Sequence, residues 1–409
     1  ESTLGNLVAE VQRHETPAAT VGAAQIAFMN PGGLRADMVG TVAGSDRNLT
    51  YKQAANVQPF ANTLVNMDLT GAQIKKVLEQ QWQRTSAGAV PTRAFLRLGV
   101  SKGFTYTYTQ QNDPVIAGAK LGTVTGMWLN GVPINPATSY SVTVNSFLAA
   151  GGDNFRELAN GTTKQDTGVT DLQAMVDYMA EFGTGTGLPV DSAQRAVGVA
   201  FPAGAPASYR PGDHVVLDLS SLSMTDPGDV KDTQVSVSLG GTNLGTAAVT
   251  TTVGSSPDNS ANSNDDAGTA HVDVLVPAGT PAGAATLTIT GPTTGTQVLV
   301  PITVAAPPPP PAPSKSPTTA KVQPQNPKAG QKVTLKVTVK AKDGSAVTGK
   351  VKIKVDGKTK TVTLKNGKAT VNLGKFSAGS YKVTVSYLGS DTVLESKDTV
   401  KFTVKKKKK

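Results

Sequence analysis

"TLVNMDLTGAQIKKVLEQQW", residues 63–82, joins a strand-like run directly to a helix-like run. The apolar and β-branched residues of "TLVNMDLT" predict a strand. Thr70 then supplies a hydroxyl of the kind that caps helix N-termini. The apolar residues behind it recur at helical spacing on one face, namely Ile74, Val77, Leu78 and Trp82. A strand followed by a one-sided helix predicts a mixed α/β domain.

The flanking sequence repeats this mixture of strands and helices. The segment "QIAFMN" (25–30) predicts a strand that breaks at Pro31-Gly32-Gly33, and "FTYTYT" (104–109) alternates like a half-buried strand. Asn130-Gly131 predicts a hairpin turn, and Thr170 with Gln173 has the spacing of a capping box before another helix. A first helix is predicted by apolar residues at helical spacing, Leu4, Leu7, Val8 and Val11. The sequence therefore predicts one α+β domain over residues 1–200.

The sequence changes character after residue 200. Residues 201–304 contain short alternating strands separated by Gly, Pro, Asp and Asn, which favours an Ig-like β-sandwich. A Pro-rich segment follows at 305–318, and consecutive prolines predict a stiff polyproline spacer. Residues 319–404 alternate Val, Ile and Leu with Lys and Thr, which predicts a second all-β sandwich with a hairpin turn at Asp356-Gly357. Residues 405–409 are a poly-Lys tail.

The net charge of +10 is unevenly distributed along the chain. The segment from Ser314 onward holds 23 Lys and 5 acidic residues, a net charge of +18, so the other 313 residues carry 16 basic and 24 acidic residues, or −8. A nucleic-acid-binding interpretation of the whole chain is therefore not supported. There is no Cys, which excludes disulfides and thiolate metal sites, and no apolar run of about 18 residues that would span a membrane.

The usual catalytic constellations do not occur in the sequence. The three His, His14, His214 and His271, lie in different regions without metal-ligand spacing. There is no GxSxG, Walker or Rossmann pattern. We therefore predict neither a catalytic residue nor a metal ligand in this chain.

Some positions could bind a ligand, although each also has an ordinary structural explanation. Arg35 follows the glycine break of "MNPGGLRAD", where it could bind a phosphate or lie in a surface turn. Phe60 in "VQPFANTL" and Phe147 in "NSFLAAGGDNF" could contact a ligand or belong to the core. Asp153 could bind a diol or simply cap a turn.

Taken together, the order "NPGGLRAD", "VQPFANTLVNMDLTGAQIKKVLE" and "NGVPINPATSYSVTVNSFLAAGGDNF" closely resembles the C-terminal domain of the 5′-nucleotidase family over roughly residues 1–200. The resemblance implies that Phe60 and Phe147 sandwich a nucleobase and that Asn62 hydrogen-bonds its edge. It also implies that Asp153 accepts hydrogen bonds from the ribose and that Arg35 faces the phosphate. Gly88, in "SAGAVPT", would line the base pocket through its backbone, and Phe155 would belong to the core.

The match has departures from the family pattern. Pro31 intrudes before the glycines that precede Arg35, and Asn154 follows the Gly-Gly-Asp run where the family usually has Gly. In the family, this domain follows a metallophosphoesterase domain that holds two divalent metal ions and carries out the chemistry. The chain begins at Glu1 rather than Met, which we interpret as a processed or trimmed start with upstream residues missing. This chain alone is therefore expected to bind no metal and to be inactive, and its phosphate binding is expected to be weak.

The resemblance implies the substrate-binding part of a secreted or cell-surface bacterial 5′-nucleotidase-like phosphoesterase, with a nucleotide or nucleoside as its ligand. One alternative is a non-catalytic cell-envelope binding or adhesion protein. Another is an extracellular nuclease or cyclic-nucleotide phosphodiesterase. The two β modules resemble bacterial Ig-like repeats. Their lysines, and the tail, could attach the protein to an anionic cell-wall polymer, or they could form a solvated face that discourages edge pairing.

Overall fold

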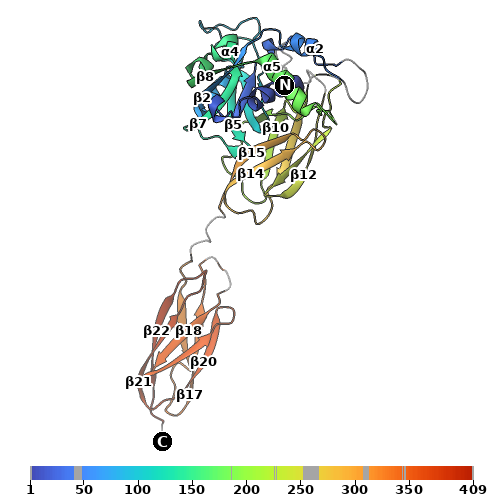
Figure 1. The fold of residues 1–409 in the computed structure, drawn as a ribbon. Helices are drawn as coiled ribbons and strands as arrows, with labels where there is room; N and C mark the ends of the chain where they lie inside the picture. Colours follow the sequence, from blue (N-terminus) through green and yellow to red (C-terminus); the bar gives the residue numbers. More distant parts are fainter. Residues whose placement is uncertain are drawn as a thin grey trace. The chain divides into compact units, whose positions relative to one another are not determined.

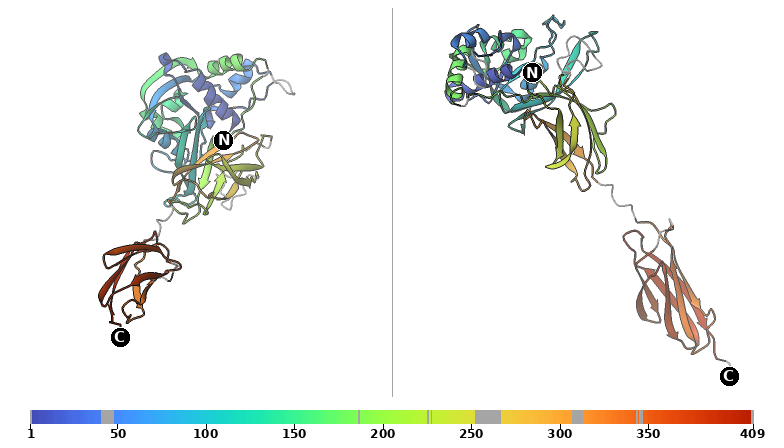
Figure 2. Two further views of the ribbon diagram at one scale, coloured as in Figure 1. Left: turned by 90° about the horizontal axis from the view of Figure 1, so that it is seen from below. Right: turned by 90° about the vertical axis from the view of Figure 1, so that its right-hand side faces the viewer.

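The computed structural model describes residues 2–40, 48–185, 187–224, 226, 228–251, 267–306, 313–342, 344 and 347–407. The chain divides into two compact units, Glu1–Pro307 and Pro308–Lys409. Among the described residues, α-helices occur only in the blue-to-green part of the chain, and strands make up the yellow-to-red part (Figures 1 and 2). The Pro-rich spacer predicted at 305–318 and the poly-Lys tail lie partly outside the described residues.

The N-terminal part of the first unit is built on a mixed sheet in the order β3-β1-β7-β2-β8. Within it, β1 and β7 are parallel, and β7, β2 and β8 are antiparallel neighbours. Its strands are β1 (Ile26–Met29), β2 (Thr63–Thr70), β3 (Gly99–Val100), β7 (Ser139–Asn145) and β8 (Thr162–Thr170). Its helices are α1 (Thr3–His14), α2 (Tyr51–Val57), α3 (Gly71–Glu79), α4 (Ser146–Ala149) and α5 (Asp171–Phe182).

Local capping explains where these helices begin. The side chain of Thr70 accepts a hydrogen bond from the backbone N–H of Gln73, and Oε1 of Gln73 accepts one from the backbone N–H of Thr70, so α3 has a complete capping box. Thr170 caps α5 in the same way, but the side chain of Gln173 donates to Asp177 at 2.7 Å and does not complete the predicted box. The helices α1 and α3 confirm the predicted apolar faces.

The prediction that Trp82 belongs to the apolar face of the helix is wrong. The helix α3 ends at Glu79, so Trp82 does not extend its apolar face. It lies in an isolated bridge with Phe95, and its side chain is still only 4% exposed because it packs on Phe95 and Tyr108.

A second sheet runs from this α/β part into the sandwich, in the order β13-β10-β9-β4-β5-β6. The strand β9 pairs in parallel with β4 and antiparallel with β10, so it joins the two parts through backbone hydrogen bonds. The opposing sandwich sheet has the order β12-β11-β14-β15. The strands are β4 (Phe104–Asn112), β5 (Lys120–Leu129), β6 (Val132–Pro133), β9 (Ala196–Ala200), β10 (His214–Ser220), β11 (Gln234–Leu239), β12 (Thr242–Ala248), β13 (Ala270–Leu275), β14 (Gly283–Thr290) and β15 (Gln297–Val304).

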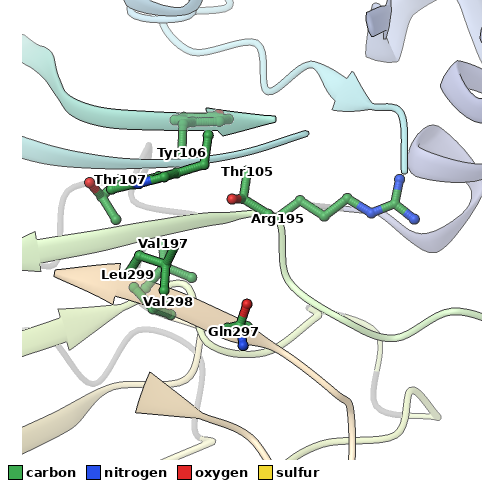
Figure 3. A pocket seen from close by; sticks show the side chains of 9 residues that line it. Thr105, Tyr106, Thr107, Arg195, Val197, Gln297, Val298 and Leu299 are labelled. Atoms are coloured by element: carbon green, nitrogen blue, oxygen red, sulfur yellow. The ribbon is translucent and has the colours of Figure 1, made fainter. Parts of the chain in front are cut away.

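Where β4, β9 and β15 meet, their side chains enclose a cavity of about 10 Å³, with Tyr106, Val197 and Val298 in its wall (Figure 3). This is room for about one water molecule. Arg195 beside it is 7% exposed and forms an ion pair with Asp191 at 2.7 Å. The junction is therefore packed and has no space for a nucleotide at this cavity.

The second unit is a sandwich of two antiparallel sheets in the orders β16-β17-β20 and β19-β18-β21-β22. Inward Val, Leu and Ile side chains alternate with exposed Lys and Thr, as in β18 with its strictly alternating burial. The predicted turns are confirmed: Asn130-Gly131 joins β5 to β6 and Asp356-Gly357 joins β18 to β19, each with positive φ at both residues. The strands are β16 (Thr318–Gln323), β17 (Lys332–Val339), β18 (Lys350–Val355), β19 (Lys358–Thr363), β20 (Lys368–Lys375), β21 (Gly379–Tyr387) and β22 (Ser396–Val404).

The predicted fold class, a mixed α/β region followed by all-β Ig-like modules, is confirmed. In the part of the chain that the structure describes, no helix is both long and apolar enough to cross a membrane.

Candidate functional site

The topology of the first sheet brings segments that are distant in the sequence to one end of its strands. Strands β1 and β7 are parallel, so their C-terminal ends, Met29 and Asn145, lie side by side. The strand β2 runs antiparallel to β7, with Leu64 opposite Asn145. The first residues of β2 therefore lie at this same end of the sheet. The segments after β1, before β2 and after β7 begin or finish at this end of the sheet, and they carry Arg35, Phe60, Asn62, Phe147 on α4, and Asp153. The ribbon that contains them is drawn in Figure 1.

A chain of hydrogen bonds connects the loops after β1 and β7. Asn145 donates from Nδ2 to Oδ1 of Asn30 at 3.0 Å, and Asn30 donates from Nδ2 to Oδ2 of Asp153 at 2.8 Å. The Oδ1 atom of Asn145 accepts from the backbone of Leu148 at 2.9 Å and so caps α4. Asn30 and Asn145 are 2% and 1% exposed, so these amides are satisfied by each other rather than by water. They hold Asp153 and the helix of Phe147 in one framework.

The glycines around Asp153 are required by close approaches. A Cβ on Gly152 would lie 2.5 Å from the ring of Phe147, and a Cβ on Gly32 would lie 3.0 Å from Oδ2 of Asp153. Asp153 itself has a φ of 51° and a ψ of 32°, in the left-handed region that a non-glycine residue seldom adopts. The same Cβ on Gly32 would lie 3.4 Å from Nη1 of Arg93.

The two candidate stacking residues are exposed, as are Tyr51 and Phe182 in the same domain. Phe60 is 55% and Phe147 46% exposed, whereas Phe28, Phe104 and Phe155 are fully buried. The burial of Phe155 confirms its assignment to the core. Arg35 is exposed, and its guanidinium carbon lies 5.8 Å from the ring centroid of Phe60, within the range of a cation–π contact.

Asn62 forms hydrogen bonds with the first residue of α5. Its Nδ2 donates to Oδ2 of Asp171 at 3.3 Å, and its backbone carbonyl accepts from the backbone of Asp171 at 2.8 Å. Burial raises the pKa of Asp171, and the hydrogen bond from Asn62 opposes that rise. Asn62 therefore has a structural contact that the sequence did not indicate.

Gly88 belongs to a loop that is fastened to the Asp153 loop. Its φ is 83°, and its backbone N–H donates to Thr85 at 2.9 Å. Arg156 donates from both terminal nitrogens to the carbonyl of Arg84 at 3.0 Å, and from Nη1 to Asn154 at 3.2 Å. The loop of Gly88 and the loop of Asp153 are thus joined by one guanidinium.

Four residues at this end of the sheet were not among the site residues predicted from the sequence: Asn30, Arg93, Asn145 and Arg156. Asn30 and Asn145 each stand at the end of a predicted strand, and a polar residue there was the available signal. Nothing in the local sequence distinguishes Arg93 or Arg156 from an ordinary surface arginine, because their neighbours are distant in the chain.

Residues 1–160 match the family described as 5′-nucleotidase, C-terminal domain, and residues 318–405 match the family described as bacterial Ig-like domain (group 3). The first 160 residues are a 5′-nucleotidase C-terminal domain. The chain is 32% identical over 188 residues to the trifunctional nucleotide phosphoesterase protein YfkN of Bacillus subtilis, covering 45% of this chain and 12% of that protein.

Two further proteins match a similar share of the chain. The cell wall protein Lmo0130 of Listeria monocytogenes is 31% identical over 183 residues, covering 44% of this chain and 21% of that protein. The solved NAD nucleotidase of Haemophilus influenzae is 25% identical, with a TM-score of 0.33, and the match covers 44% of this chain and 30% of that one. The chain therefore spans a minor part of each of these relatives.

Proposed function

We propose that the 5′-nucleotidase C-terminal domain of this chain binds the nucleoside part of a nucleotide phosphate ester, as the substrate-binding part of a phosphoesterase. The observation that carries the proposal is the Asn145–Asn30–Asp153 hydrogen-bond chain. It holds a carboxylate and an exposed aromatic ring, Phe147, on one framework. The family membership of residues 1–160 supports the same conclusion.

Each predicted residue has a chemical role in this proposal. The rings of Phe60 and Phe147 stack on the nucleobase, an interaction worth about 1–3 kcal/mol per base that tolerates any base. Asp153 uses Oδ2 for Asn30 and offers Oδ1 to the ribose hydroxyls. Arg35, exposed above Phe60, faces the phosphate.

Asn62 and Gly88 contribute to the edge of the base in this proposal. The Oδ1 atom of Asn62 accepts from the base while its Nδ2 holds Asp171. The backbone of Gly88 lines the pocket, where a Cβ would meet open space among the described atoms. Both groups lie on loops that other residues fasten, so they need little rearrangement to bind.

The hydrolytic chemistry of this proposal requires two divalent metal ions, and the described residues do not fit such a centre. Among them there is no group of three or more His, Asp or Glu side chains that could hold a metal ion. In this proposal the metal ions belong to the metallophosphoesterase domain that the family resemblance implies. This chain contributes the binding and orientation of the nucleoside.

Calorimetric titration of the chain with adenosine tests the nucleoside site. We expect weak binding that Phe147→Ala abolishes, because truncation removes one of the two stacking surfaces. Phe201→Ala is the matched control, since Phe201 is 38% exposed and follows β9 in the sandwich. Equal affinity of the Phe147→Ala variant and the unchanged chain would refute the stacking role.

We also propose that the protein acts outside the cytoplasm, secreted or attached to the cell surface. The cell wall protein among its relatives and the bacterial Ig-like domain support this location. The same relative supports a second candidate function, a non-catalytic envelope protein that keeps this domain for binding. Nucleotide hydrolysis by the full-length protein would distinguish the two, because only the phosphoesterase proposal requires it.

A further inference from the structure

The second unit presents a lysine face, which we define as the outward side chains of strands β16, β17 and β20. Five of them are exposed lysines: Lys321, Lys332, Lys336, Lys368 and Lys375. The remaining outward positions of these strands are Thr, Gln and Asn. Among the described residues of this face there is no carboxylate to neutralise the lysines.

The strand register places lysines directly opposite each other. Lys321 is the partner of Lys336, and Lys332 is the partner of Lys375. Side chains in such pairs have Cβ atoms about 5 Å apart, and like charges at that position destabilise a sheet. An anion bound between each pair would remove this repulsion. One such pair, Lys382 opposite Lys401, also occurs on the other sheet, so the pairs gain meaning here from the hollow beside them.

Protection of sheet edges explains only some of these lysines. Edge strands often carry charges that prevent pairing with another chain. Lys321 on β16 and Lys368 on β20 are at edges of this sheet, but β17 is the central strand. Lys332 and Lys336 therefore stand where there is no edge to protect.

The lysine face is also hollowed near one end of β16 and β17. An open hollow of about 420 Å³ is lined by Lys321, Lys332, Gln323, Gln325 and Thr334. It combines two ammonium groups with amide and hydroxyl groups, which suits a ligand that carries both negative charge and hydroxyls. The volume is within the range of about 300–1,000 Å³ typical of ligand sites.

We propose that the lysine face binds a linear polymer of polyol units joined by phosphodiesters. The two lysine pairs are separated by four residues along β17, or about 13 Å, so they contact phosphates spaced along an extended chain. The polyol lies between them over Gln323, Thr334 and Asn372, which occupy the intervening row of the sheet. The segment from Ser314 contains no Arg, so this face offers lysine ammonium groups, which bind phosphate as point charges.

Nucleic acid fits the lysine face less well than this polymer. Single-stranded nucleic acids are usually held by aromatic side chains that stack on the bases. The outward side chains of β16, β17 and β20 include no aromatic residue. This inference does not depend on the nucleoside site of the first unit.

The test is a titration of fluorescent poly(glycerol phosphate) with the full chain, followed by anisotropy over a range of salt concentrations. The test variant is Lys321→Gln/Lys332→Gln/Lys336→Gln. The control variant is Lys350→Gln/Lys352→Gln/Lys354→Gln, which removes the same charge from exposed positions of β18 in the other sheet. Both variants keep residues 405–409, so the contribution of the tail cancels.

We expect the test variant to raise the Kd at least about tenfold and to reduce the slope of log Kd against log salt by about two to three. The control variant should change the Kd less than about threefold, because its charges act only at a distance. Equal losses in the two variants would overturn the proposal, and so would equally tight binding of oligo(dT) or polyglutamate of the same charge. If the triple variant loses its β-sheet circular dichroism spectrum, Lys336→Gln against Lys352→Gln applies the same comparison one residue at a time.

Discussion

Replacing Asn145 with alanine tests whether the amide chain holds the candidate site together. The change removes the N-cap of α4, which costs about 1 kcal/mol. It also leaves Oδ1 of Asn30 without its partner in a site where Asn30 is 2% exposed, which costs about 1–3 kcal/mol. Together, the free energy of unfolding of the first unit should fall by about 2–4 kcal/mol.

Urea unfolding followed by tryptophan fluorescence measures this loss. The chain has 2 Trp, Trp82 and Trp128, and both lie in the first unit, so the signal reports that unit. Thr170→Ala is the matched control, because Thr170 caps α5 without leaving a buried amide unpaired, and it should cost about 1 kcal/mol. The reasoning is wrong if Asn145→Ala lowers the free energy of unfolding no more than Thr170→Ala does, while the slope of that free energy against urea concentration is unchanged.

Two further predictions concern pH and catalysis. Burial raises the pKa of Asp171 above its usual 3.8, so its contribution to stability is fully present below pH 3.8 and is lost as pH rises through the raised native value. The Asp171→Asn variant should lose this dependence in urea titrations at several pH values, and an unchanged pH profile would contradict it. The chain alone should release no phosphate from AMP with added divalent metal ions, as measured by a phosphate assay; turnover above background would show that it contains a metal site.

Local rules predicted those features whose causes lie within a few residues. Thr70 caps α3 because a hydroxyl at that position reaches a backbone N–H three residues ahead. Asn130-Gly131 forms a turn because both residues tolerate positive φ. The alternation of Lys with Val in β18 gives one buried face and one exposed face.

The framework of the candidate site could not be predicted in the same way. Asn30 and Asn145 are 115 residues apart, and their contact depends on β1 and β7 being parallel neighbours. No local pattern fixes which strands become neighbours. The contact of Arg156 with the loop of Gly88 likewise depends on the packing of that loop. The sequence of β9 also did not predict that this strand pairs with both β4 and β10.

The uneven charge gives the two proposed binding sites different electrostatic surroundings. The chain before Ser314 carries a net charge of −8 and the chain from Ser314 carries +18. A polyanion that is attracted to the lysine face is therefore repelled by the bulk of the first unit. Screening limits this repulsion to about 8 Å at physiological salt, so it acts only on polymer segments close to the surface of the first unit. The charge distribution thus favours binding of the polymer to the second unit over binding to the first.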